Sequence, residues 1–523
     1  MNIALICRGF IPLLLLTTLA CLMGCSGQKS SDSGGWFKKK ADTATDIPTI
    51  PREFRAVWVA TVANIDWPST PGLTTQEQKD ELITILDRCV EMNFNAVVLQ
   101  VRPTADALYA SELEPWSYYL TGEMGKAPEP YYDPLTFAVQ EAHARGLELH
   151  TWFNPYRALH PSNKGKVSDN HISKTHPEVV HKYGPYLWMD PAEPVVQQHS
   201  LDVIMDVVNR YDIDGVHMDD YFYPYKVDDK DGNEIDFPDD RAWSIYQEAG
   251  GKLGRSDWRR KAVDDFIQRL YKSVKQSKPH VQVGLSPFGI WKPGFPEQIK
   301  GFNQYEGLYA DAKLWLNKGW IDYFTPQLYW EIAKPDQSFT ALLGWWTKEN
   351  KKGRHIWPGI APYRTGKQFD ENEVQYQIKW SRILTPDSPG TVHFSMQSYM
   401  GDDSALVKQI KETVYGKPAL APASPWLGRK RPNTPIAHVT GNDPGVLTIK
   451  AEPKSLEGLR CWVVQIKQGR AWSYEIIPAL QATTKIKLPN ADAPADLVVV
   501  SYISRTGVQS KPQTLLMQED TLK

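Results

Sequence analysis

Eight runs of β-branched and aromatic residues, each followed by a segment with helical spacing, constrain the fold of this chain more than any other feature. The runs begin at Phe54, Phe94, Leu147, Ile213, Val281, Ile321, His355 and Thr391. Between them, apolar residues recur at i, i+3 and i+4, as in the segment 82–90. Strand and helix segments that alternate in this way predict βα units around a parallel sheet.

Eight such units over residues 51–416 predict an α/β fold, a (β/α)8 TIM barrel with long loops. An open, doubly wound sheet is the alternative architecture. That architecture normally has a glycine-rich phosphate-binding turn after its first strand, and the segment VANIDWPSTPG from Val62 is not such a turn. The barrel is therefore the leading prediction.

The N-terminal region predicts export and lipid attachment. Residues 1–24 carry one positive charge and an apolar stretch that is short for a membrane span, as in a signal peptide. LMGC, which ends at Cys25, resembles a bacterial lipobox and predicts a lipidated cysteine. Cleavage without a lipid, after Gly24 or near Cys21, is the alternative. Residues 25–50 are polar and predict a flexible tether, so we expect a lipid anchor in the cell envelope, at the outer membrane or cell surface.

The C-terminal region has a different sequence pattern from that of the barrel. Five prolines between Pro418 and Pro435 predict a linker or an extended strap over residues 417–435. Residues 436–523 hold short alternating strands separated by Gly, Pro, Asn and Asp. This pattern predicts a small all-β sandwich that resembles fibronectin type III or immunoglobulin-like modules.

Composition excludes several classes of function. The chain balances 59 basic against 61 acidic residues and has no long basic stripe, so nucleic acid is not an expected partner. Outside the signal and lipobox, Cys89 and Cys461 are the remaining cysteines, too few for a disulfide framework. The histidines lack metal-ligand spacing, so we predict no metal and no other cofactor. In contrast, 19 Trp, 24 Tyr and 16 Phe predict aromatic rings in a binding cleft.

GVHMDDYFYP, residues 215–224, places two adjacent carboxylates at the end of the predicted fourth strand. Alternation along a strand predicts that His217 and Asp219 face the barrel mouth, whereas Asp220 turns toward the loop or a backbone cap. Active sites of TIM barrels lie at this carboxyl edge of the strands. The side chains predicted to reach this edge and bind substrate are Arg102, Asp106, Asn154, Arg157, His217, Tyr221, Gln327, Tyr329, Trp330 and Gln397.

Carboxylates among aromatic rings and amides predict glycoside hydrolysis, because rings stack on sugars while two acids flank the scissile bond. We predict Asp219 as the nucleophile and Glu331 as the acid/base, since neighbouring rings could desolvate Glu331. Asp220 is a further catalytic candidate, and a solvated loop residue is the alternative for Glu331. Arg102 could clamp a substrate carboxylate or form a structural salt bridge with a nearby aspartate.

Several long motifs carry a family resemblance. They are REFRAVWVATVANIDWPS, QVRPTADALYASELEPWSYYLTG, WFNPYRA, GVHMDDYFYP, LSPFGIW and PQLYW. Over residues 51–415 the chain resembles the glycosyl hydrolase-like family 10 domain of bacterial envelope lipoproteins. The resemblance implies a TIM barrel with glycosidase activity and, for some relatives, an association with cell-wall glycans. DGVHMD is also similar to the strand-four motif of the α-amylases and α-galactosidases, which implies that Asp219 is the nucleophile and that His217 replaces the amylase arginine.

The predicted function is a retaining glycoside hydrolase of the cell envelope. Its substrate would be a polysaccharide or a peptidoglycan strand, and its lipid anchor would hold it at the membrane. A catalytically silent glycan-binding lipoprotein that uses the same cleft is the alternative.

Overall fold

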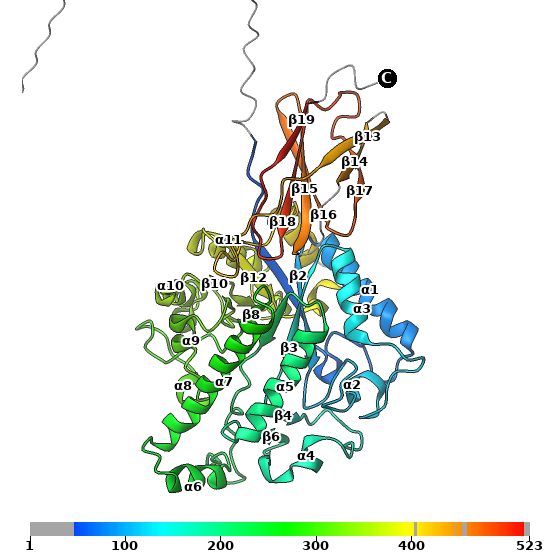
Figure 1. The fold of residues 1–523 in the computed structure, drawn as a ribbon. Helices are drawn as coiled ribbons and strands as arrows, with labels where there is room; N and C mark the ends of the chain where they lie inside the picture. The colour runs from blue at the N-terminus through cyan, green and yellow to red at the C-terminus, as the bar shows by residue number, and fades with distance from the viewer. Residues whose placement is uncertain (1–46, 402–404, 444, 452–457, 517–523) are drawn as a thin grey trace, which may run out of the picture. The chain divides into compact units, whose positions relative to one another are not determined.

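The computed structural model describes residues 47–401, 405–443, 445–451 and 458–516 (Figure 1). The predicted signal peptide, the predicted lipidation site Cys25 and the tether up to residue 46 lie outside these residues. Within the described part of the chain, no helix has the length and apolar character needed to cross a membrane.

The main sheet is parallel throughout and closes on itself. Its strands lie in the order β10-β9-β8-β7-β3-β2-β1-β12-β11. They are β1 (Phe54–Val59), β2 (Ala96–Arg102), β3 (Glu148–Phe153), β7 (Gly215–Met218), β8 (Gln282–Leu285), β9 (Tyr323–Phe324), β10 (His355–Ile356), β11 (Gly359–Ile360) and β12 (Gly390–His393).

The two ends of this sheet, β10 and β11, are consecutive pieces of one strand that is interrupted at Trp357 and Pro358. The first piece pairs with β9 and the second with β12, so the interrupted strand joins both ends of the sheet. The result is an eight-stranded closed barrel, which confirms the fold predicted from the sequence.

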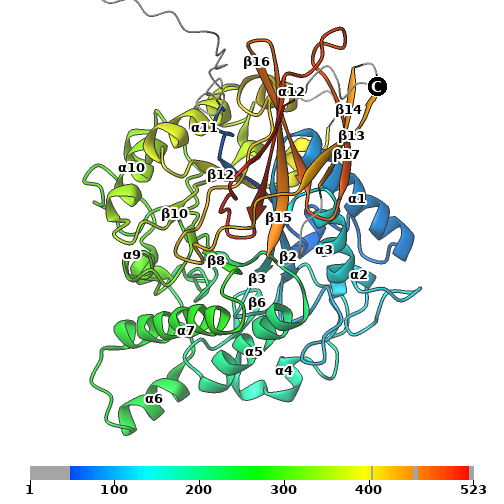
Figure 2. The same cartoon turned by 45° about the horizontal axis from the view of Figure 1, so that its top comes forward.

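Amphipathic helices surround the barrel (Figures 1 and 2). Helix α1 begins with a capping box between Thr74 and Glu77, and the stripe that includes Leu82, Leu86 and Cys89 is buried. The principal helices are α1 (Thr75–Glu91), α3 (Pro134–Ala144), α5 (Pro194–Arg210), α7 (Arg255–Ser277), α9 (Ala312–Lys318), α10 (Phe339–Glu349), α11 (Glu373–Leu384) and α12 (Ala405–Thr413).

Shorter elements lie in the loops that follow the barrel strands. A small antiparallel sheet in the order β4-β6-β5 follows β3. These elements are α2 (Tyr118–Thr121), β4 (Arg157–Leu159), α4 (Ile172–Thr175), β5 (Val180–Tyr183), β6 (Tyr186–Met189), α6 (Asp240–Glu248) and α8 (Gln304–Gly307).

The C-terminal module is built from two antiparallel sheets, with orders β13-β14-β17 and β16-β15-β18-β19. Leu447, Trp462 and Val500 belong to the buried cluster that both sheets share, so the predicted all-β character is confirmed. Two strands, β13 and β19, were not predicted from the sequence. The strands are β13 (Ala437–Asp443), β14 (Val446–Ala451), β15 (Leu459–Gln468), β16 (Ala471–Pro478), β17 (Thr483–Lys487), β18 (Leu497–Ser504) and β19 (Gln513–Leu516).

The segment that begins at Pro418 runs as an extended strap. The Leu420 backbone donates to the carbonyl of Pro51 at 3.0 Å and accepts from the Glu53 amide at 2.8 Å. The Tyr474 hydroxyl of β16 donates to the Pro418 carbonyl at 2.6 Å. The strap is therefore hydrogen-bonded both to the segment that leads into β1 and to the C-terminal module.

Candidate active site

Asp219 and Asp220, which we call the acid pair, directly follow β7 at its carboxyl end. Each residue is 5% exposed. The barrel brings the ends of β3 and β9 to the same edge, because all eight strands run in parallel. Two adjacent carboxyl groups are thus enclosed at the end of the barrel where the sequence predicted an active site.

Three donors hold the Asp219 carboxylate. The Asn154 side-chain amide donates to both carboxylate oxygens, at 2.8 Å each. The Trp152 indole donates at 3.2 Å, and the Tyr221 backbone amide at 3.3 Å. Hydrogen bonds of this kind favour an ionised carboxylate and fix its orientation.

Asn154 is itself oriented by two further donors. Its side-chain oxygen accepts from Gln100 Nε2 at 2.7 Å and from Arg157 Nη2 at 2.9 Å, which turns its NH2 group toward Asp219. Arg157 also donates to the Pro103 carbonyl at 2.9 Å and stacks 4.9 Å from the centre of the Tyr221 ring. Asn154 and Arg157 were predicted from the sequence to bind substrate, and in the structure they hold Asp219 in place.

Asp220 faces different partners. Its carboxylate accepts a short hydrogen bond from the Tyr225 hydroxyl in the loop after β7. It also accepts from the side chain of Gln327, which follows β9. The expectation that Asp220 turns toward the loop is therefore incomplete, because the chain bends after β7 and keeps this carboxylate buried beside a barrel residue.

The enclosure of the acid pair changes its titration. Burial, together with the neighbouring charge of Asp220, raises the pKa of Asp219 to about 7, although Arg157 and Asn154 act in the opposite direction. Burial also raises the pKa of Asp220, against the hydrogen bonds from Tyr225 and Gln327. Because two adjacent buried carboxyl groups resist double ionisation, the acid pair retains a proton near neutral pH.

Five half-buried aromatic rings follow one another from Tyr221, the residue next to the acid pair. Ring centres follow one another from Tyr221 to Tyr225 at 5.7 Å and from Tyr225 to Phe302 at 5.2 Å. The series continues to Phe288 at 5.3 Å and from there to Trp330 at 5.5 Å. We call these five residues the aromatic row. Tyr329 lies close enough to the acid pair that Asp220 contributes, after burial, to raising the pKa of its hydroxyl.

Glu331 lies in the loop that follows β9 and is half-buried. Its carbonyl accepts from the Lys334 and Phe339 amides, both at 3.3 Å, so its backbone is fixed in a turn. Among the described residues, no hydrogen bond or ion pair reaches its carboxylate. This side chain is therefore less restrained than either member of the acid pair.

Several residues predicted to bind substrate have structural partners instead. Arg102, 1% exposed, forms an ion pair with Glu114 and donates to the Asn154 carbonyl at 2.6 Å. A structural salt bridge was the alternative left open for Arg102, although its partner is a glutamate and not an aspartate. Asp106 is fully enclosed, and burial raises its pKa. Both side chains are enclosed, and Glu114 of the loop after β2 is the ion-pair partner of Arg102.

His217 differs from expectation, whereas Gln397 stays a prediction. His217 is fully buried inside the barrel, where it contacts Trp58, Ser286 and Tyr323 and lies below the mouth. Gln397 is exposed, and its backbone amide donates to Asp66 at 2.7 Å. Alternation correctly placed His217 on the inner face, but depth along the barrel decides whether an inner residue reaches substrate.

Comparisons with known proteins identify the family to which the barrel belongs. The family model of Glycosyl hydrolase-like 10 matches residues 53–378. The chain belongs to this family. Membership confirms the resemblance found in the sequence motifs and assigns the chain to the glycoside hydrolases.

Curated relatives of this glycosyl hydrolase-like chain agree with that assignment. The chain is 40% identical over 419 residues to Glycosyl hydrolase YngK of Bacillus subtilis (strain 168), covering 77% of this chain and 80% of that protein. It is 32% identical over 334 residues to Glycosyl hydrolase DigH of Escherichia coli (strain K12), covering 60% of this chain and 74% of that protein. Among solved structures, the PgaB (BpsB) glycoside hydrolase domain of Bordetella bronchiseptica aligns with a TM-score of 0.48 and 15% identity, covering 69% of this chain and 99% of that chain.

Sequence reasoning missed two residues that contact the acid pair of this glycoside hydrolase. Trp152 lies on β3, two residues before Asn154, which directly follows this strand, so the alternation rule could have identified it. Tyr225 lies in the loop after β7, where no periodicity applies, and nothing in the sequence indicated its bond to Asp220.

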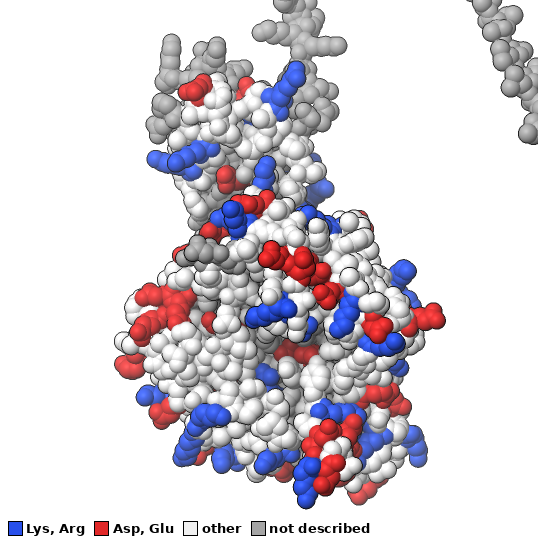
Figure 3. Space-filling model, turned by 180° about the vertical axis from the view of Figure 1, so that it is seen from behind, with Lys and Arg blue, Asp and Glu red and all other residues white. Residues whose placement is uncertain are grey.

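The described residues hold no group of three or more His, Cys, Asp or Glu arranged for a metal ion. On the face seen in Figure 3, lysines and arginines are interspersed with acidic residues over the surface.

Proposed function

We propose that this chain is a retaining glycosidase that cleaves a polysaccharide or peptidoglycan strand in the cell envelope, with the acid pair at the centre of its chemistry. The observation that carries the proposal is the buried acid pair at the end of β7, in which burial raises the pKa values of both carboxyl groups. Such a pair holds one carboxyl and one carboxylate at neutral pH, the two protonation states that glycoside hydrolysis requires.

In this proposal Asp219 attacks the anomeric carbon. Asn154 and Trp152 orient its oxygens, and the hydrogen bonds that they donate stabilise the ionised form. The proton for the leaving oxygen comes from a second carboxyl, either Glu331, as the sequence predicts, or Asp220. The bond to the leaving group breaks as the glycosyl–Asp219 ester forms, and water then hydrolyses that ester with the second carboxyl as base.

The aromatic row supports a polymeric substrate. Aromatic faces stack on sugar rings, and five rings in series offer more stacking surface than one sugar needs. Because Tyr225 belongs to this row and also bonds to Asp220, the binding surface is continuous with the acid pair. A polysaccharide bound along the row would have one of its linkages beside the carboxylates.

The experiment uses the chain from Gly35 onward with peptidoglycan strands, with and without peptides, and with neutral and acidic polysaccharides. Products are read by mass spectrometry, and the anomer of the first product is read by NMR. Loss of product in Asp219→Asn would establish the glycosidase, whereas an inverted anomer would reject retention. If the chain binds a glycan but releases no product from any of them, the alternative function, a catalytically silent glycan-binding lipoprotein, would be favoured.

A second set of variants assigns the proton donor. Glu331→Gln and Asp220→Asn are each compared on the natural glycan and on an aryl glycoside with a good leaving group. The variant in which the proton donor has been replaced should lose activity on the natural glycan but keep most of its activity on the aryl glycoside, because that leaving group needs little protonation. Asp219→Asn should be inactive on both substrates.

The envelope location is tested through Cys25. Wild-type chain and Cys25→Ser are expressed with their own N-terminal segment, and membrane and soluble fractions are compared. We expect the wild type in the membrane fraction and the variant released from it.

A further inference from the structure

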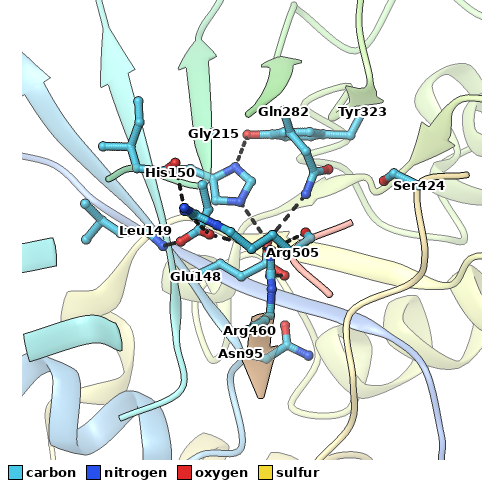
Figure 4. Close-up of polar contacts among 12 residues, drawn as sticks. Asn95, Glu148, Leu149, His150, Gly215, Gln282, Tyr323, Ser424, Arg460 and Arg505 are labelled. Atoms are coloured by element: carbon cyan, nitrogen blue, oxygen red, sulfur yellow. Dashed lines mark hydrogen bonds and ion pairs between the residues drawn. The ribbon is translucent and has the colours of Figure 1, made fainter. Parts of the chain in front are cut away.

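Four polar side chains form a continuous line of hydrogen bonds inside the barrel. They are Glu148 and His150 of β3, Tyr323 of β9 and His217 of β7, and we call them the interior relay (Figure 4 shows its first three members). Glu148 is 2% exposed, and the other three are fully buried. Polar groups this deep in a barrel core cost free energy unless each one is satisfied.

Each step of the interior relay is within hydrogen-bonding distance. Glu148 Oε2 lies 3.1 Å from His150 Nε2, and His150 Nδ1 lies 2.9 Å from the Tyr323 hydroxyl. The same hydroxyl lies 3.0 Å from His217 Nδ1. His217 Nε2 is 3.2 Å from Trp58 Nε1 and 2.8 Å from Ser286 Oγ.

Two glycines make room for the rings. A Cβ at Gly215 would lie 2.2 Å from His150 Nδ1, and a Cβ at Gly284 would lie 1.9 Å from the Tyr323 ring. Both glycines occupy inward-facing positions on the barrel strands, where a side chain would normally fill the core. The backbone is therefore shaped around the relay.

The direction of the hydrogen bonds follows from the chemistry at the two ends. The Trp58 indole can only donate, so His217 Nε2 must accept and the His217 proton must sit on Nδ1. That proton is donated to the Tyr323 oxygen, so the Tyr323 hydroxyl donates to His150 Nδ1 and His150 carries its own proton on Nε2. Glu148, as a carboxylate, can only accept that last proton.

Two other observations agree with this direction. Burial lowers the pKa of His150 to about 4 and lowers that of His217 well below its usual range, so both imidazoles are neutral. Arg460 of β15 forms an ion pair with Glu148, and a carboxylate in such a pair accepts hydrogen bonds but donates none. Both ends of the relay thus require the same arrangement of protons.

The upper end of the interior relay is connected to the acid pair. The Ser286 carbonyl accepts from Gln327 Nε2 at 2.8 Å, and the Gln327 side chain donates to Asp220. Trp58 belongs to the same buried cluster as Trp152, whose indole donates to Asp219. His217 lies on β7, two residues before Asp219, which directly follows this strand.

We propose that the interior relay sets a single tautomer of His217 and thereby fixes the supports of the acid pair, so that Glu148, His150, Tyr323 and His217 are positioning residues for the glycosidase. This inference rests on the proposed function for its catalytic consequence. Arg460 gives the C-terminal module a part in the same network, because it supplies the positive charge opposite Glu148.

The first test needs no substrate. The full chain is labelled with 15N-histidine, and NMR correlations between ring nitrogens and ring protons identify the tautomers, with His150→Asn and His217→Asn used to assign the signals. We expect His217 protonated on Nδ1 alone and His150 on Nε2 alone. A proton on His217 Nε2, a mixture of tautomers or a charged imidazole would overturn the proposal.

The second test measures turnover in Tyr323→Phe, Glu148→Gln and the double variant. Tyr323→Phe interrupts the relay, and we expect kcat to fall about tenfold with KM little changed, the size typical of losing a partner behind a functional histidine. The double variant should be no slower than Tyr323→Phe alone, because both changes act through one network. The relay would be contradicted if the falls in kcat of the two single variants multiplied in the double variant, or if kcat were unchanged in Tyr323→Phe.

Matched controls separate positioning from stability. Tyr399→Phe removes a buried hydroxyl that bonds to His393 Nδ1 outside the relay, and Glu53→Gln removes a buried carboxylate that pairs with Arg55 and Arg382 outside the relay. Both controls should lose stability but keep kcat, and an equal fall in kcat would reject a specific role for the relay. If no glycan is cleaved, the proposed function fails, whereas the tautomer test still decides whether the relay exists.

Discussion

Replacing Asp219 by asparagine should make the folded chain more stable at neutral pH. The pKa of this carboxyl rises from about 3.9 in an unfolded chain to about 7 in the folded one. The folded chain therefore binds the proton more tightly than the unfolded chain, and stability falls as the pH rises from about 4 to about 7. A shift of about three units corresponds to about 4 kcal/mol, and Asp219→Asn removes this cost.

The new amide introduces a smaller penalty. Its oxygen can accept from Asn154, but its NH2 group then faces the Trp152 indole donor, at a cost of about 1 kcal/mol. We therefore expect a net gain of about 3 kcal/mol at pH 7.5. At pH 4.5 the ionisation cost is nearly absent, and the variant should be slightly less stable than the wild type.

Thermal unfolding of both proteins between pH 4.5 and pH 8 measures this difference. Asp214→Asn is the matched control of opposite sign, because Arg505 and His143 outweigh burial and hold the pKa of Asp214 below its usual range. That variant should be less stable by a nearly constant amount from pH 4.5 to pH 8, because the contribution of a lowered pKa is complete above the unfolded value of about 3.9. An Asp219→Asn protein that is less stable than the wild type at pH 7.5, or equally stabilised at all pH values, would refute the reasoning.

Three other substitutions test the surroundings of the site. Arg102→Leu leaves Glu114 buried without its main cation and should cost about 3–5 kcal/mol in urea unfolding, whereas a loss below about 1 kcal/mol would show that the pair is dispensable. Tyr225→Phe removes a hydrogen bond that opposes the raised pKa of Asp220, so if Asp220 is the proton donor the alkaline limb of the kcat/KM profile should move to higher pH. An unmoved limb would separate Tyr225 from the titrating proton donor. Gly284→Ala places a methyl group against the Tyr323 ring and should lower Tm strongly, while Gly294→Ala, at a site with open space, should cost only the strain of its positive φ.

The local sequence pattern was sufficient to predict most of the barrel strands. Each of the eight apolar runs contains or overlaps a strand of the closed sheet, because buried parallel strands need continuous β-branched and aromatic residues. The short β9, reduced to Tyr323 and Phe324, and the division of the seventh strand into β10 and β11 were not foreseen. Pro326 and Pro358 lack the amide protons that would extend these ladders.

The candidate site was predictable only in part. Asp219, Asn154 and Arg157 could be found because each follows a strand, and parallel strands bring their carboxyl ends to one edge. Arg102 follows the same rule, yet the loop after β2 returns Glu114 to its guanidinium and removes it from the cleft. The rule gives the edge on which a side chain lies, and the loops decide whether it is exposed there.

Taken alone, the sequence determined that this chain forms a barrel of βα units with two carboxyl groups at the end of its fourth strand, because periodicity and strand order are local properties. The tertiary structure decided which groups those carboxyl groups contact, how far burial raises their pKa values, and that Glu148, His150, Tyr323 and His217 meet in one line. These residues come from three strands that are far apart in the chain, and only closure of the barrel brings their side chains within hydrogen-bonding distance.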